Sequence, residues 1–139
     1  MTKSCKWLES YQRLFKTPIL FFCILMPYLL DSIHSAAIYS RPKESGLDLV
    51  GHWGIVVKNA SGSYLCHNMP KTGTVATPAS NMSGNWKHVT DVPVNGEKCI
   101  QGMFKSSGLA AYLPQSIAKY LLQGTCVGAT SDMAGYLVS

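Results

Sequence analysis

Charge is scarce in this chain: only 14% of its 139 residues are Asp, Glu, Lys or Arg, whereas 47% are hydrophobic and 10% are aromatic. Soluble domains usually carry about 25% charged residues. Disordered polypeptides are poorer in aromatic and apolar side chains, so the composition excludes that class. The length allows one compact domain at most.

A basic stripe for nucleic acid is also missing. The formal net charge is +5, but four of the twelve basic residues stand before residue 17. Beyond residue 37, eight Lys or Arg are set against five Asp or Glu, and the basic residues do not cluster. Nucleic-acid binding needs basic side chains that follow the phosphates. We therefore expect no nucleic-acid partner.

The longest apolar run is too short for a membrane span. Fourteen uncharged residues occupy positions 17–30 and include Pro27, whereas a spanning helix needs about 20 apolar residues. A basic stretch precedes the run, and the small residues Ser35-Ala36-Ala37 follow it. This order is typical of a secretory signal peptide. We therefore expect residues 1–37 to be a signal that is cleaved near Ala37.

The signal decides the expected compartment. After cleavage, a single domain over residues 38–139 would be secreted and extracellular, with an exposed lead-in over residues 38–48. The alternative is an uncleaved anchor tilted through residues 17–40, which would have to bury Asp31 and His34. Membrane contact is expected only in that alternative, in which the domain faces the lumen or the outside.

The cysteine count is odd once Cys5 and Cys23 leave with the signal. In an oxidising compartment, an odd count leaves one thiol outside any internal bridge. The most economical pairing joins Cys66 to Cys99 and leaves Cys126 free. The alternative is that all three are buried and unbridged.

Several motifs are absent or weak. No CxxC or HxxxH spacing supports a zinc site, although a site built from His52, His67 and Cys126 is an alternative. No Ser stands in a GxSxG turn, so a serine triad has little support. We expect no cofactor and no metal. Asn59 and Asn81 each begin an Asn-x-Ser acceptor for glycosylation.

Alternating and β-branched residues predict an antiparallel sheet. The clearest pair is a hairpin, with strands at 50–58 and 63–69 around a turn at 59–62. Weaker strands are expected at 74–77, 86–92 and 99–104. Helical spacing follows residue 108, and a last helix begins near Thr125, with an apolar stripe of Val127, Met133, Ala134, Leu137 and Val138. The fold class is therefore α+β, a small antiparallel sheet with C-terminal helices.

The hairpin places two imidazoles on one face. Its turn pairs residues whose numbers sum to about 121, which sets His52 opposite Met69 and His67 one diagonal step away. A one-residue slip would separate the two rings. His88, beside Lys87, is expected to be exposed.

Cys126 stands at the start of the predicted last helix, where free amide groups and the helix dipole favour a thiolate. A thiol near a helix start and an imidazole can lose its proton well below pH 8.5. Such a thiolate can attack a carbonyl, with one histidine acting as base and then as acid. The residue types therefore suggest a cysteine nucleophile, although a surface histidine pair with a structural thiol fits them as well.

Three short segments resemble the lecithin:retinol acyltransferase-like group, a circularly permuted branch of the NlpC-type papain-like cysteine hydrolases. That group has an H-[WY]-[AG]-I-x-[VL] strand, then H-x-x-P, then a helix that begins with the nucleophilic Cys. The corresponding stretches here are HWGIVV at 52–57, HNMP at 67–70 and GTC at 124–126. The resemblance covers roughly residues 48–70 and 117–138. It implies His52 as base, His67 as its polar support and Cys126 as nucleophile, on a permuted papain-like fold.

The group usually has Asn-Cys-Glu-His-Phe at the nucleophile, whereas this chain has Thr-Cys-Val-Gly-Ala at 125–129. This departure favours hydrolysis over lipid acyl transfer. We therefore expect a secreted cysteine hydrolase that acts on an amide or ester, with a peptide, a cell-wall crosslink or a lipid acyl group as substrate. The alternatives are a lipid acyltransferase, or an inactive binding module that uses the loop from Lys71 to Trp86.

Overall fold

The computed structural model describes residues 27–42, 51–69, 72–107 and 125–139. Five strands and three helices, together with one 3-10 turn, make up these ranges. In chain order they are α3 (Pro27–Leu30), β1 (Ser35–Arg41), β2 (His52–Asn59), β3 (Gly62–Met69), β4 (Gly73–Pro78), η1 (Ala79–Asn81), β5 (Lys87–Val92), α4 (Ile100–Ser106) and α6 (Thr125–Val138).

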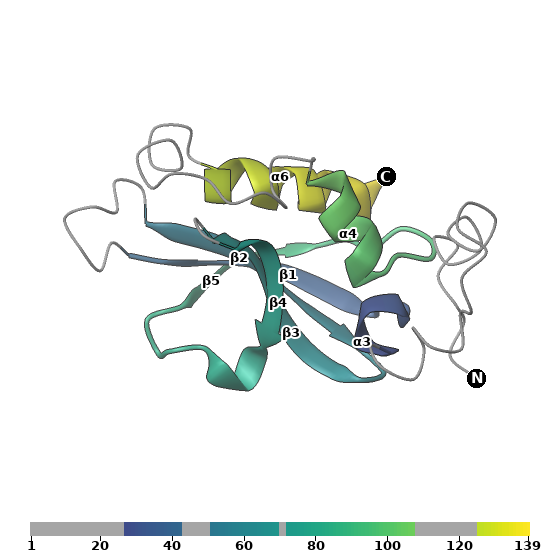
Figure 1. The fold of residues 1–139 in the computed structure, drawn as a ribbon, viewed down its shortest axis with the longest axis horizontal. Coiled ribbons are helices and arrows are strands. Elements are labelled where there is room, and N and C mark those ends of the chain that lie inside the picture. Colours follow the sequence, from purple (N-terminus) through teal and green to yellow (C-terminus); the bar gives the residue numbers. More distant parts are fainter. Residues whose placement is uncertain (1–26, 43–50, 70–71, 108–124) are drawn as a thin grey trace.

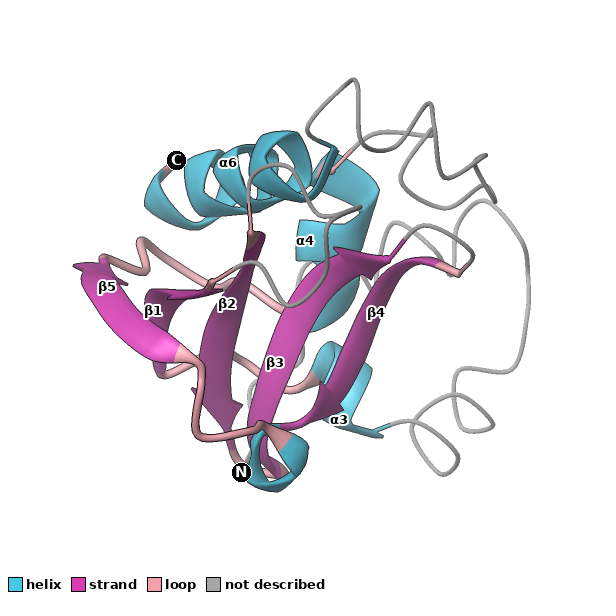
Figure 2. Ribbon diagram, turned by 90° about the vertical axis from the view of Figure 1, so that its left-hand side faces the viewer, coloured by secondary structure: helices cyan, strands magenta, loops and turns pink. Residues whose placement is uncertain are grey.

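The strands form one sheet in the order β4-β3-β2-β1-β5, and every neighbouring pair is antiparallel (Figure 2). Helices α4 and α6 lie on one face of this sheet, while η1 and the connection to β5 lie on the opposite side (Figure 1). We call the face without α4 and α6 the open face. The chain thus has an α+β fold with its C-terminal helix packed on the sheet, as the sequence predicts.

The β2–β3 hairpin has the predicted register. Gly54 pairs with His67, and Asn59 pairs with Gly62. The Asn59 side chain accepts hydrogen bonds from the backbone N–H groups of Ser61 and Gly62. Gly62 adopts a φ of 143°, which a residue with a side chain rarely tolerates. Local turn chemistry therefore fixes which residues share each face.

The core lies between the sheet and the helices. Ile55 and Val57 of β2 are fully buried, as are Met103 of α4 and Met133 and Leu137 of α6. Each fully buried aliphatic side chain contributes roughly 1.5–3 kcal/mol relative to an exposed one. Alternation along β2 therefore points residues 53, 55 and 57 at the helices and residues 52, 54 and 56 at the open face.

The expected exposed lead-in over residues 38–48 is wrong for its first four residues, and residues 43–48 lie outside the described residues. Strand β1 contains those first four residues and lies between β2 and β5 inside the sheet. Residues before β1 also belong to the fold, since Leu29, Leu30 and Ile33 are buried in the core together with Ala36 of β1. The backbone N–H of Ile33 and that of His34 donate to the carbonyls of Lys98 and Lys58, each at 2.8 Å. Cleavage near Ala37 would therefore remove part of an internal strand.

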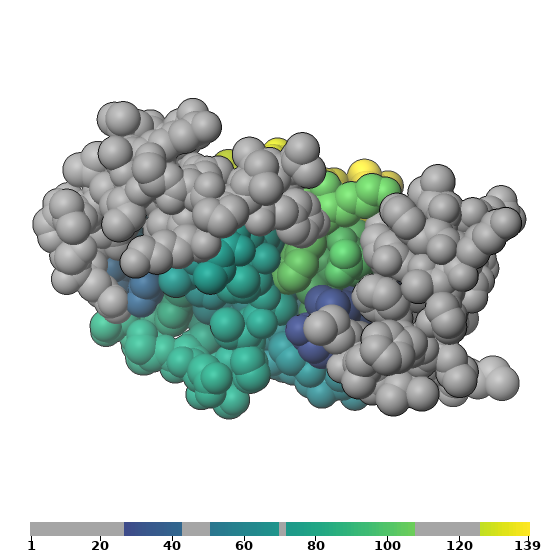
Figure 3. Space-filling view, viewed as in Figure 1, coloured from purple at the N-terminus to yellow at the C-terminus, as the bar shows by residue number. Residues whose placement is uncertain are grey.

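The remaining part of the expected signal, residues 1–26, lies outside the described residues. Secretion and cleavage stay predictions. None of the helices in the described ranges is long and apolar enough to cross a membrane. Within the fold, α3 lies directly beside α4, as the purple and green residues of Figure 3 show.

The strand expected at residues 99–104 is wrong, because this segment is the helix α4. Cys99 is its N-cap, and the Cys99 sulfur accepts a hydrogen bond from the Gly102 N–H at 3.4 Å. A Cβ at Gly102 would lie 2.0 Å from the Tyr136 hydroxyl of α6. The α4 segment thus meets α6 closely at Gly102, where any side chain would have to displace the Tyr136 ring, and this long-range packing outweighs its strand-like composition.

Other predicted elements are confirmed or partly corrected. β4 and β5 confirm the strands expected at 74–77 and 86–92. The last helix is confirmed, but Val127 and Val138 are 40% and 43% exposed, so its buried stripe differs from the expected one. That stripe consists of Cys126, Ala129, Thr130, Met133 and Leu137. The helical segment expected after residue 108 lies outside the described residues.

Candidate functional site

His52 and His67 form a direct pair on the open face. Nε2 of His52 and Nδ1 of His67 are joined by a hydrogen bond of 2.8 Å, and the ring centroids are 5.0 Å apart. The two side chains are only 5% and 8% exposed. The predicted meeting of the rings on one face is therefore confirmed.

Gly54 makes room for this pair. It lies opposite His67 in the β2–β3 ladder. A Cβ at Gly54 would come within 2.8 Å of Leu65 Cδ1 and 3.0 Å of the His67 Cβ. Real Cβ atoms hardly ever approach other atoms this closely, so any larger residue would displace β3 and the His67 side chain.

Trp86 covers both imidazoles from the connection between η1 and β5. Its ring centroid lies 5.5 Å from that of His52 and 6.1 Å from that of His67. The Arg41 guanidinium at the end of β1 lies 5.4 Å from the centroid of the Trp86 ring. The sequence pattern singled out neither residue for a role at the site, because a long-range strand pairing brings Arg41 opposite His52.

Both histidines are neutral near pH 7. Burial lowers the pKa of His52 from 6.5 to about 4, and the positive charge of Arg41 adds to this effect. Burial also lowers the pKa of His67 to about 4, with further contributions from His52 and Arg41. A neutral imidazole donates through one nitrogen and accepts through the other. Of the two nitrogens that face each other, one must therefore donate the hydrogen bond and the other must accept it.

Cys126 lies at the start of α6, beside the residue before His52. Its thiol donates to the Gly51 carbonyl oxygen at a sulfur–oxygen distance of 3.8 Å, across 75 positions of the chain. The side chain is 2% exposed. Within the described ranges, no hydrogen bond joins this sulfur to either imidazole. α6 packs on the face opposite to the one from which His52 projects (Figure 1).

The other cysteines do not form the predicted bridge. Cys66 is a free thiol, fully buried in the core, and burial raises the pKa of this thiol. Cys99 is also fully buried and caps α4. No disulfide therefore joins Cys66 to Cys99, and the alternative of three buried, unbridged cysteines describes the structure.

A metal site has no support in the described part of the chain. No group of three His, Cys, Asp or Glu side chains there is placed to hold an ion. The alternative of a zinc site formed by His52, His67 and Cys126 is therefore not favoured by their positions.

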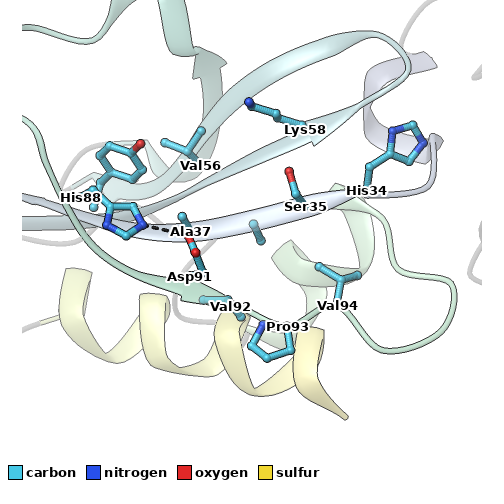
Figure 4. A pocket seen from close by; sticks show the side chains of 12 residues that line it. His34, Ser35, Ala37, Val56, Lys58, His88, Asp91, Val92, Pro93 and Val94 are labelled. Atoms are coloured by element: carbon cyan, nitrogen blue, oxygen red, sulfur yellow. Dashed lines mark hydrogen bonds and ion pairs between the residues drawn. The ribbon is translucent and has the colours of Figure 1, made fainter.

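A hollow of about 480 Å³ lies on the open face beside β5. His88 and Asp91 meet in it, with 2.8 Å between Nε2 and a carboxylate oxygen, and Lys58 lines its other side (Figure 4). The His88 side chain is 48% exposed, as predicted. Ser35 also lines the hollow, but no hydrogen bond joins it to His88 within the described ranges, so the residues do not make a serine triad.

The two glycosylation acceptors differ in access. Asn59 is 8% exposed, and its amide nitrogen donates to the Tyr28 carbonyl at 2.8 Å. A glycan is attached through this nitrogen, and its burial leaves little room for a glycan at Asn59 in the folded structure. Asn81 is exposed on η1, and glycosylation there stays a prediction.

Comparison with protein-family models, with curated proteins and with solved structures finds no match to this chain.

Proposed function

We propose that this chain is a cysteine hydrolase of the permuted papain-like type, with Cys126 as nucleophile and His52 as base. The observation that carries the proposal is the contact between the Cys126 sulfur and the Gly51 carbonyl. It brings the start of the last helix to the residue before His52, which in turn is hydrogen-bonded to His67. The proposed mechanism requires Cys126 to lie near His52, and this contact brings together residues that are 75 positions apart in the chain.

The His52–His67 hydrogen bond defines how the proton would move. Nε2 of His52 faces His67, so Nδ1 is the nitrogen left to accept the thiol proton. His52 must then carry its own proton on Nε2 and donate it to His67 Nδ1. Cys126 would release its hydrogen bond to Gly51, form a bond to the substrate carbonyl carbon and pass its proton through His52 to the leaving group. Water would then cleave the acyl-enzyme.

The substrate class is an amide or an ester, and release of the acyl group to water is the outcome we favour. Incubation with p-nitrophenyl acetate followed by a rapid acid quench tests this step, because nitrophenolate leaves as the acetyl group is transferred to the nucleophile, and the quench traps the acyl-enzyme before water cleaves it. We expect peptide mass mapping to find the acetyl group on Cys126 in the wild type. Cys126→Ser should lose it, whereas the matched variant Cys99→Ser should keep it. An acetyl group spread over lysines and absent from Cys126 would contradict the proposal.

A binding module without turnover is the second candidate. It is favoured by the Cys126 thiol, which is 2% exposed and hydrogen-bonded to a backbone carbonyl rather than to an imidazole. It is also favoured by the Trp86 ring over the two histidines. This candidate predicts that Cys126 is not acetylated and that Cys126→Ser leaves ligand binding unchanged.

A further inference from the structure

Trp86 is a half-buried side chain in an otherwise exposed stretch of the chain. From Ser83 to Thr90, every other residue is exposed. The backbone N–H of Trp86 donates to the Ser83 carbonyl at 3.3 Å, which places the residue at the end of a turn just before β5. A large aromatic ring that is half-buried between solvent-facing neighbours is held there by contacts with other parts of the fold.

These contacts come from three strands. The Trp86 ring makes angles of 65° with the ring plane of His52 on β2 and 80° with that of His67 on β3, so it meets both imidazoles edge to face. This is a favoured arrangement for aromatic pairs with centroids roughly 4.5–7 Å apart. Arg41 at the end of β1 makes a cation–π contact with the same ring. The position of the Trp86 ring is therefore defined by side chains that lie next to one another in the sheet.

The His52–His67 hydrogen bond depends on the exclusion of water. In contact with water, each nitrogen of a neutral imidazole finds a partner in the solvent, and either nitrogen can carry the proton. Burial removes this competition, and Trp86 covers both rings from the open face. Helix α6, which carries Cys126, packs on the opposite face (Figure 1). The Trp86 ring and the start of α6 therefore approach the pair from different sides of the sheet.

We propose that Trp86 is a positioning residue for the histidine pair, whose ring keeps water away from the His52–His67 hydrogen bond. This bond holds the proton of His52 on Nε2 and leaves Nδ1 to accept the proton of Cys126. Only this last step rests on the proposed hydrolase function, since the shielding is a property of the folded chain with or without turnover. The pKa values of about 4 for both imidazoles agree with a pair that is kept from water.

Heteronuclear NMR of the histidine side chains tests the shielding on the full chain near neutral pH, because it identifies which ring nitrogen carries the proton. In the wild type we expect the His52 proton on Nε2 and slow exchange of that proton with water. Trp86→Leu should make this exchange at least about tenfold faster, because the loss of two aromatic contacts raises the open population by about this factor. An unchanged exchange rate in Trp86→Leu would overturn the proposal.

The wild-type spectrum decides by itself if Trp86→Leu does not fold, since a His52 proton on Nδ1, or averaged over both nitrogens, would also overturn the proposal. Trp86→Phe keeps a flat ring and should restore most of the protection. Tyr39→Leu is the matched control, because Tyr39 lies edge to face with the exposed His88 at a centroid distance of 5.5 Å. It should leave the His52 and His67 signals unchanged, and an equal acceleration in Tyr39→Leu would count against a specific role of Trp86.

Acetylation of Cys126 by p-nitrophenyl acetate provides the second readout. We expect Trp86→Leu to acetylate Cys126 more slowly than Trp86→Phe, and equal rates would contradict the positioning role. A wild type that does not acetylate Cys126 but protects the His52 proton, with that protection lost in Trp86→Leu, would contradict the hydrolase and support the shielding by Trp86. The two proposals can therefore fail separately.

Discussion

At the scale of single residues, the histidine pair links the stability of the fold to pH. The folded protein holds both imidazoles neutral down to about pH 4, whereas an unfolded histidine takes up a proton near pH 6.5. Between these values the unfolded state binds more protons. The free energy of unfolding therefore falls as the pH falls from about 6.5 toward 4. Above pH 6.5 the histidine pair does not make this free energy depend on pH.

Urea titrations between pH 7.5 and pH 4.5 measure this effect. We expect the wild type to lose about 1–3 kcal/mol over that range. A His52→Asn/His67→Asn double variant should lose clearly less, because its two amides do not titrate. The exposed His88→Asn serves as the control and should follow the wild type. A double variant with the wild-type pH dependence would show that the imidazoles are not buried in neutral form.

Gly54 gives a second test at this scale. Gly54→Ala places a methyl group against Leu65 and His67, so we expect it to destabilise the protein by about 1–3 kcal/mol. Gly84 has open space around it, and Gly84→Ala should change the stability by at most about 0.5 kcal/mol. Thermal unfolding compares the two. Equal unfolding midpoints for the two variants would mean that β2 and β3 are farther apart at Gly54 than the structure shows.

At the scale of the elements, the sequence patterns predicted correctly those features of the fold that depend on residues close together in the sequence. The β2–β3 register follows from the Asn59–Gly62 turn and from side-chain alternation, and both are local. Helix α4 was missed because its apolar composition suits a strand equally well. What makes it a helix is the Cys99 cap together with the close approach of Gly102 to Tyr136, and the second of these depends on a segment more than thirty residues away.

Two helix glycines test that contact. Alanine normally stabilises a helix by about 1 kcal/mol relative to glycine. Gly135→Ala in α6, where nothing lies within 4 Å, should show a gain of this kind. Gly102→Ala should instead destabilise by about 1–3 kcal/mol, because its methyl group overlaps Tyr136. A double variant with Tyr136→Leu should recover part of that loss. A stabilising Gly102→Ala would contradict the α4–α6 packing.

At the scale of the whole molecule, the first described residues are part of the fold. Tyr28 stacks on Tyr64 with 4.9 Å between ring centroids, and β1 joins β2 to β5. The sequence pattern assigned this segment to a signal, because apolar and small residues after a basic stretch suit both a signal peptide and a buried strand. Trp86 and Arg41 were missed at the site for a related reason: long-range pairing alone brings them to the histidines.

Two shortened chains test where the domain begins. A chain that starts at Pro27 keeps α3 and β1, so we expect it to unfold cooperatively. A chain that starts at Ile38 lacks four core residues (Leu29, Leu30, Ile33 and Ala36) and the first three of the seven residues of β1, so it should show no cooperative unfolding. Circular dichroism during heating reports both outcomes. A cooperative transition in the shorter chain would show that the domain folds without its first strand residues.

The central claim is that Cys126 and His52 act together, and the pH dependence of Cys126 alkylation by iodoacetamide tests it most directly. Because His52 is neutral near pH 7, it would take the thiol proton as the new bond forms, so the account predicts that Cys126 is alkylated faster near pH 7 in the wild type than in His52→Ala. An ordinary thiol profile that is identical in wild type and His52→Ala would contradict it.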